Sequence, residues 1–179
     1  AMAANKSVFS SMSTVADLKA WSKQKMGDTN LPLISATRTA DGYWTVPGIE
    51  YDLAGKQRPY AVSKEYVEKV VPAIHAVDPS LTVKVVSGGQ EPGEGTGSHR
   101  HDVDGKGESG TADLVLVRNG KALSPEKDKE VYAKVLENLA AQGFTGIGHY
   151  GWGIHVGGGS RAKWGPDKTG ATVDPVYSA

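Results

Sequence analysis

The sequence predicts a single α+β domain in which helices pack on a small antiparallel sheet. Helical and strand patterns follow one another in the order helix, helix, strand, strand, helix, hairpin, and not as regular β–α repeats. The chain of 179 residues, 39% hydrophobic and 22% charged, is long enough for one domain with a core. We place this domain at residues 13–165, between a flexible N-terminus at 1–12 that contains a tag remnant and an irregular tail at 166–179.

Two helices are predicted in the first half of the chain. Residues 13–26 form a helix capped by Ser13 or Thr14. Residues 63–80 form a second helix that starts at Ser63, and Pro72 is expected to kink it or to end its first half. Its buried stripe is Val67, Val70, Val71 and Ile74. The intervening residues 37–62, rich in turn-forming and aromatic side chains, predict β-hairpins or an elaborated loop.

The second half of the chain contains the predicted strands. Residues 81–86 alternate, and residues 111–117 form a more apolar strand that ends at the turn dipeptide Asn119-Gly120. A third helix is expected from Ser124, with proline at its first position, to Gly143. Residues 144–156 then read as two short strands around a glycine-rich bend.

Composition excludes several classes of protein. The 20 basic and 20 acidic side chains give no net charge, whereas a nucleic-acid-binding protein has a basic excess. No apolar run has the length of a membrane-spanning helix, and the N-terminus lacks the layout of a signal peptide, so we expect a soluble protein with no membrane partner. The absence of cysteine excludes disulfides, thiolate metal sites and a cysteine nucleophile. Any metal must therefore be bound by histidine, carboxylate or main-chain oxygen.

Four of the five histidines lie in two glycine-rich stretches, GSHRHDVDGKGESGTADL at 97–114 and GIGHYGWGIHVGGG at 146–159. Asp113 lies in an apolar strand, where a carboxylate is costly unless it is paired or binds a metal. His155 lies in a short apolar strand as well. Taken singly, Asp113 is best explained as a turn residue and His155 as a buried, hydrogen-bonded histidine. Together with His101 they form a His-Asp-His set, and three protein ligands with an open fourth position are typical of catalytic zinc.

Five motifs follow one another along residues 87–165: SGG at 87–89, SHRH at 98–101, GTADLVL at 110–116, GIGHYGWGIHV at 146–156 and SRAKWG at 160–165. In these motifs the chain resembles the zinc peptidases of peptidoglycan stem peptides, namely D-alanyl-D-alanine carboxypeptidases, dipeptidases and L-alanyl-D-glutamate endopeptidases of hedgehog-like fold, in a bacteriophage-type variant. The resemblance covers residues 80–165. It implies that fold, zinc bound by His101, Asp113 and His155, a peptidoglycan peptide as substrate, and a location in a phage virion or outside the cytoplasm at the cell wall.

The sequence also departs from the family pattern. The step from His101 to Asp113 is twelve residues (113 − 101), longer than usual, and His99 is an alternative ligand. The family arginine that polarises the substrate carbonyl is replaced by Gln90, so we expect Gln90 or Arg100 to act at the developing oxyanion. Gly157 stands where some relatives have aspartate.

The acid that precedes the last histidine in the family is missing as well. We therefore predict that His149 is the general base, with the loop acids Glu91, Glu94 and Glu108 as alternatives.

Three functions remain open at this point. The first is a zinc-dependent peptidase that cuts peptidoglycan stem peptides. The second is an inactive member of the same fold that acts as a structural or cell-wall-binding module of a phage particle. The third is a calcium-stabilised loop protein that uses residues 102–108, whose acids and glycines resemble an oxygen-rich calcium loop.

Overall fold

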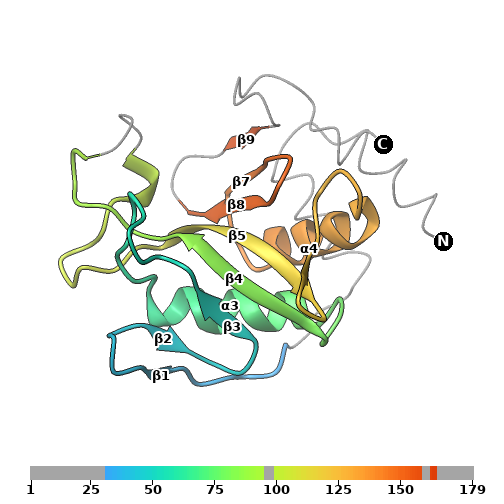
Figure 1. Cartoon of the computed structure of the whole chain (residues 1–179), viewed down its shortest axis with the longest axis horizontal. Coiled ribbons are helices and arrows are strands. Elements are labelled where there is room, and N and C mark those ends of the chain that lie inside the picture. Colours follow the sequence, from blue (N-terminus) through green and yellow to red (C-terminus); the bar gives the residue numbers. More distant parts are fainter. Residues whose placement is uncertain (1–30, 95–98, 159–161, 165–179) are drawn as a thin grey trace.

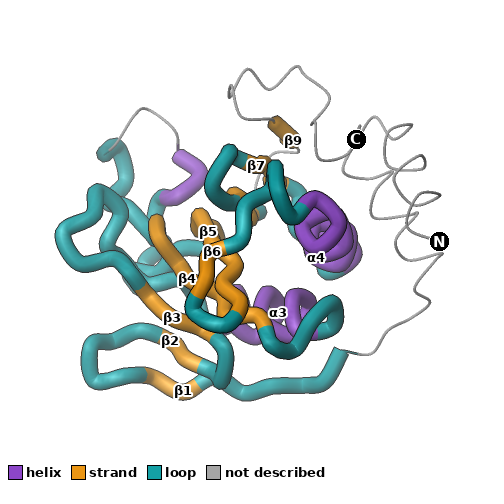
Figure 2. Tube along the Cα trace, turned by 45° about the vertical axis from the view of Figure 1, so that its right-hand side comes forward, coloured by secondary structure: helices purple, strands orange, loops and turns teal. Residues whose placement is uncertain are grey.

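The computed structural model describes residues 31–94, 99–158 and 162–164 of the chain. Its main elements are a mixed β-sheet and two α-helices, α3 (Lys64–His75) and α4 (Lys129–Ala141). The helices lie behind the sheet in Figure 1 and to one side of it in Figure 2, so both cover the same face. The α+β class predicted from the sequence is confirmed. Neither helix is long and apolar enough to span a membrane.

The main sheet has the strand order β3-β4-β5-β8-β7-β9, with β6 paired to β5. The strands are β3 (Ile49–Tyr51), β4 (Leu81–Ser87), β5 (Thr111–Arg118), β6 (Lys121–Ala122), β7 (Gly146–His149), β8 (Ile154–Gly157) and β9 (Ala162–Trp164). The pairs β4–β5, β5–β6, β5–β8 and β7–β8 are antiparallel. The pairs β3–β4 and β7–β9 are parallel, so the prediction of a purely antiparallel sheet is wrong at both edges. The chain reaches β4 from β3 through α3, and such a crossover is what a parallel pair requires.

The segment 37–62 contains one β-hairpin, as one of the two predicted alternatives had it. Its strands β1 (Thr37–Arg38) and β2 (Trp44–Thr45) form a separate two-stranded sheet. The same segment also supplies β3, which joins the main sheet.

Helix α3 starts as predicted, because the Tyr66 N–H donates to the Ser63 hydroxyl. It runs through Pro72 and ends at His75, five residues before the predicted end. Asp78 accepts a hydrogen bond from the N–H of Ser80 at 2.9 Å, and this turn leads the chain into β4.

Helix α4 starts at Lys129, later than predicted. Ser124 and Asp128 bond to each other instead: the Asp128 N–H donates to the Ser124 carbonyl, and the Ser124 N–H donates to the Asp128 carboxylate. This closed turn holds the proline outside the helix. The predicted stop at Gly143 is right, since this glycine has a φ of +99° just after the helix.

The turn predicted at Asn119-Gly120 and the hairpin predicted within 144–156 are both present. Asn119 and Gly120 have positive φ angles of 51° and 75° and connect β5 to β6. Strands β7 and β8 form the hairpin predicted within 144–156. Strand β9 was not predicted, and the predicted helix at 13–26, the N-terminus at 1–12 and the tail at 166–179 lie outside the described residues.

The two faces of the sheet differ in character. Because cross-strand partners share a face and neighbours along a strand alternate, Leu114 and Ile154 belong to one face and Asp113 and His155 to the other. The first face is apolar and buried, in one core cluster with the side chains of α3 and α4. Asp113 and His155 therefore lie on the face opposite the helices.

Candidate metal centre

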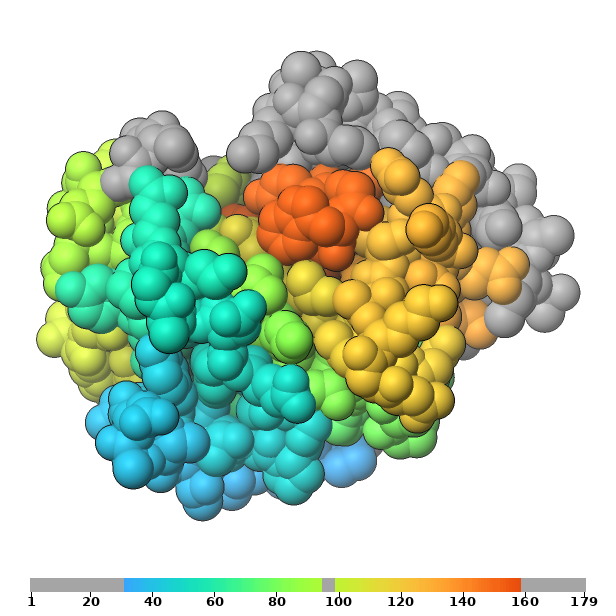
Figure 3. All heavy atoms as spheres, in the orientation of Figure 1, coloured from blue at the N-terminus to red at the C-terminus, as the bar shows by residue number. Residues whose placement is uncertain are grey.

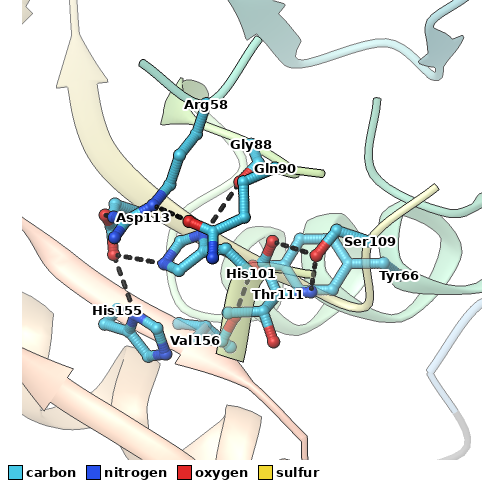
Figure 4. A network of polar contacts seen from close by, with 10 residues as sticks. All are labelled: Arg58, Tyr66, Gly88, Gln90, His101, Ser109, Thr111, Asp113, His155 and Val156. Atoms are coloured by element: carbon cyan, nitrogen blue, oxygen red, sulfur yellow. Dashed lines mark hydrogen bonds and ion pairs between the residues drawn. The ribbon is translucent and has the colours of Figure 1, made fainter. Parts of the chain in front are cut away.

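His101, Asp113 and His155 come together on the face of the sheet opposite the helices (Figure 4). Asp113 on β5 is the direct cross-strand partner of His155 on β8. His101 closes a single 3₁₀ turn at His99–His101, and its carbonyl accepts the Gln90 N–H at 2.8 Å, which ties the loop to the end of β4. The three residues are only 2%, 4% and 2% exposed, and one ligand atom from each lies within 4.8 Å of the others. This buried group can bind a metal ion.

Hydrogen bonds fix how the two imidazoles face the cluster. His101 Nδ1 lies 2.7 Å from the Gly88 carbonyl oxygen, to which only a protonated nitrogen can donate. His101 Nε2 is therefore the nitrogen that points to Asp113, with Oδ1 at 3.7 Å. His155 directs its Nδ1 to the same oxygen at 2.9 Å. A backbone carbonyl that orients a ligand histidine is a usual feature of metal sites.

The local electrostatics suit a cation. Burial lowers the pKa of His101 to about 4, although the nearby Asp113 acts in the opposite direction, so the imidazole is neutral near pH 7 as a metal ligand must be. Burial by itself would raise the pKa of Asp113. The hydrogen bond with His155 and the charges of His101, His155 and Arg58 outweigh burial and keep that pKa below its ordinary value. The cluster thus presents a carboxylate beside the neutral imidazole of His101.

Arg58 is a site residue that the sequence did not reveal. Its Nη1 lies 3.7 Å from Asp113 Oδ2, and its Nε donates to Gln90 Oε1 at 2.9 Å (Figure 4). The Arg58 side chain is 18% exposed, so it is partly accessible from solvent. No spacing rule connects Arg58 to the motifs, the first of which begins 29 residues later (87 − 58). It arrives because Tyr60 pairs with Gly89 in an isolated bridge.

Gln90 differs from its predicted role at the oxyanion. Its carboxamide oxygen accepts from Arg58, and its nitrogen donates to Asp102 Oδ1 at 2.8 Å. Both ends of this buried side chain are therefore used to hold other side chains. Gln90 therefore positions Arg58, and its carboxamide is bonded to Arg58 and Asp102.

His149 and Arg100, the other two predicted catalytic residues, lie in different places. His149 pairs with Ile154, and the register therefore places it on the helix-covered face, away from His155. The structure does not bring His149 to the cluster, and the prediction that it is the general base loses its geometric basis. Arg100 lies against Gly146, with Nη1 2.9 Å from where a Cβ would be. Gly146 is two residues before Gly148, the partner of His155, so Arg100 lies over the same sheet face as the cluster.

His99 is outside the cluster. Its side chain is 77% exposed and its Nδ1 lies 2.8 Å from Asp102 Oδ2. Between the two alternatives for the first ligand, the structure selects His101.

The acids of the loop 102–108 have structural roles. Asp104 Oδ1 accepts from the N–H groups of Lys106 and Glu108, and closes a turn. The Glu108 carboxylate accepts from the Trp44 indole and from Arg38, so it holds the β1–β2 hairpin. These carboxylates do not gather around a common point, and in the ranges described the only candidate metal cluster is the His-Asp-His group. The calcium-loop alternative is not supported.

Gly157 is enclosed by its neighbours on the sheet. A Cβ on Gly157 would lie 2.1 Å from Thr111 Oγ1. Thr111 is its cross-strand partner and is itself buried. A side chain at position 157 would therefore have to displace Thr111.

Comparison with models of protein families and with curated proteins finds no match to this chain.

Proposed function

We propose that this chain is a zinc-dependent peptidase that hydrolyses peptide bonds in peptidoglycan stem peptides. The observation that carries the proposal is the buried cluster of His101, Asp113 and His155, whose donor atoms converge although the residues come from a loop and two strands. The order of the motifs around these residues supports the hedgehog-like peptidase fold and a role in phage-borne cell-wall degradation.

Zinc is the ion that best suits this donor set. Two imidazoles and one carboxylate match its preference, and three protein ligands leave a position for water or substrate. When bound, zinc polarises a carbonyl group and lowers the pKa of water. Burial of the three ligands excludes bulk water from their side of the site.

Arg58 would bind the carbonyl oxygen of the bond that is cut. Its guanidinium is held beside Asp113 by Gln90, and it keeps donors for a ligand because it is partly exposed. A fixed cation near a carbonyl stabilises the negative charge that develops on its oxygen during attack. In this proposal Arg58 takes the role that the resemblance gives to the family arginine, and Gln90 keeps it in place.

The proton of the attacking water must be taken by another group. Glu108 is engaged by Trp44 and Arg38, which leaves Glu91 and Glu94 among the loop acids. Glu91 is hydrogen-bonded to the hydroxyl of Tyr60, two residues from Arg58. We propose Glu91 for this role on the strength of that position.

An inactive cell-wall-binding module is the alternative function. It is favoured by one observation. His149, the predicted general base, lies on the helix-covered face of the sheet, opposite the metal cluster. Such a module would keep the metal cluster as a structural element.

Digestion of purified muropeptides tests the proposal. The zinc-loaded protein should release fragments with new amino and carboxyl ends, detected by liquid chromatography and mass spectrometry. His155→Ala is the matched control and should release none. A zinc-loaded wild-type protein that binds muropeptides of several chemotypes and cleaves none would establish the module instead.

A further inference from the structure

The turn between β7 and β8 carries a pair of stacked aromatic rings, of which Trp152 is exposed and Tyr150 is half-buried. The ring centroids of Tyr150 and Trp152 are 4.8 Å apart, and their planes differ by only 9°. Trp152 is 48% exposed, although tryptophan normally buries most of its surface. The orange β7–β8 segment is visible on the face of the molecule shown in Figure 3, which is the face opposite the helices. We call Tyr150 and Trp152 the aromatic ledge.

The backbone holds this ledge in a fixed position. The Tyr150 N–H donates to the Gly153 carbonyl at 2.8 Å and closes the turn. Gly153 packs directly on β5, since a Cβ there would lie 2.4 Å from the Leu114 carbonyl oxygen. The two rings are therefore presented by the same rigid hairpin that carries His155.

A carboxylate lies at the edge of the ledge. Glu126 Oε1 is 3.5 Å from the point where a Cβ on Gly151, the residue between the two aromatic residues, would be. Glu126 is exposed, so it can accept hydrogen bonds from a ligand. Flat apolar faces beside a hydrogen-bond acceptor complement a sugar ring, whose C–H groups stack while its hydroxyl and amide groups donate.

Other occupants suit the ledge less well. Glu126 repels nucleic acids and anionic lipid surfaces. A protein partner or a second copy of this chain needs about 800 Å² on each side for a standard interface. The other exposed large hydrophobic residues in the described ranges, Leu33 and Tyr60, lie on other segments and do not extend this turn.

We propose that the aromatic ledge is a saccharide subsite, which stacks on an N-acetylhexosamine ring of the glycan strand. The choice of this sugar rests on the proposed function, because stem peptides are attached to such strands. Trp152 lies three residues before His155, a span of at most about 10 Å along the chain. A sugar on the ledge would therefore place its attached peptide close to the metal cluster.

Titration of the 179-residue chain with triacetylchitotriose, a soluble sugar without peptide, tests this subsite. The trisaccharide should shift the indole N–H resonance of Trp152, assigned by its loss in Trp152→Phe. Trp152→Ala should weaken binding by about tenfold or more, as for removal of a central aromatic anchor. Glu126→Gln should weaken it less, and Leu33→Ala, which removes an exposed side chain elsewhere, should have no effect.

Two outcomes would overturn the subsite: wild-type affinity in Trp152→Ala, or no shift of its indole resonance at saturating sugar. Loss of a dimer in Trp152→Ala, seen by light scattering, would assign the ledge to a second copy and also overturn it. This test is independent of hydrolysis. Sugar binding at Trp152 in a protein that cleaves no muropeptide would retain the subsite and reject the peptidase, whereas cleavage of sugar-free peptide without sugar binding would do the reverse.

Discussion

Two histidines only two positions apart have different environments. His101 is buried with one nitrogen on the Gly88 carbonyl, whereas the His99 side chain lies in solvent against Asp102. Both belong to the same motif, SHRH, so the motif alone does not distinguish them. It depends on the 3₁₀ turn, which directs one ring inward and the other outward.

Replacing His101 and His99 one at a time tests which of the two binds zinc. His101→Ala should weaken zinc binding by more than about 100-fold, beyond the 10–100-fold typical of outer-shell partners. His99→Ala should leave zinc affinity within a few fold and serves as the matched control. Competition with a chromophoric chelator measures both, with circular dichroism to establish folding. Equal losses in the two variants would contradict this assignment.

Arg58 and Gln90 should affect turnover and not metal binding. If Arg58 stabilises charge on the scissile carbonyl, Arg58→Ala should lower kcat by about 10²–10³-fold with unchanged zinc content. Gln90→Ala should lower kcat less, because it only loosens the guanidinium. A change confined to KM in both variants would show that Arg58 acts in uniform substrate binding.

At the scale of elements, local sequence patterns predicted which strands, turns and hairpins are present better than they predicted which face of the sheet a side chain occupies. The strands at 81–86 and 111–117, the turn at Asn119-Gly120 and the hairpin within 144–156 are all present. The sequence could not show which face His149 occupies, because a shift of one residue in register exchanges the faces of a strand. The late start of helix α4 was missed for a different, local reason. The hydrogen bonds between Ser124 and Asp128 compete with those of the first helical turn.

Helix α4 also contains a buried carboxyl group that should make stability depend on pH. Glu137 is 6% exposed, and burial raises its pKa from 4.5 to about 7. The folded state therefore holds this proton more tightly than the unfolded state, so stability is greatest below pH 4.5 and falls as pH rises towards 7.

Glu137→Gln should remove this dependence. The variant should be more stable than wild type at pH 8, by roughly 1–3 kcal/mol, with little difference at acidic pH. Urea unfolding at both pH values measures the difference, and Glu130→Gln on the same helix is an exposed control. A stabilisation of Glu137→Gln that is the same at both pH values would show that charge is not its cause.

At the scale of the whole molecule, the features that the sequence could not show depend on pairing between segments far apart in the chain. The parallel edge pairs β3–β4 and β7–β9 join segments without a shared motif. The bridge between Tyr60 and Gly89 likewise brings Arg58 to the cluster. The three residues of the candidate metal cluster could be predicted because each is a polar side chain in an apolar or glycine-rich setting. Arg58 gave no such signal, since a partly exposed arginine in a loop is common.

A ligand that binds only the folded chain stabilises the whole domain. Zinc at 100 times its Kd should add about 2.7 kcal/mol to the free energy of unfolding. Differential scanning calorimetry of zinc-free and zinc-loaded protein should show the corresponding rise in Tm, with His155→Ala as a control that shows none. An equal rise in His155→Ala would place the stabilising zinc elsewhere.

The zinc content of the purified chain tests the central claim most directly. Native mass spectrometry of protein that was stripped with a chelator and then exposed to zinc should show about one zinc per chain, and none in His155→Ala. A wild-type chain that remains metal-free in excess zinc, or a His155→Ala variant that retains a full equivalent, would contradict the assignment of His101, Asp113 and His155 as a zinc site.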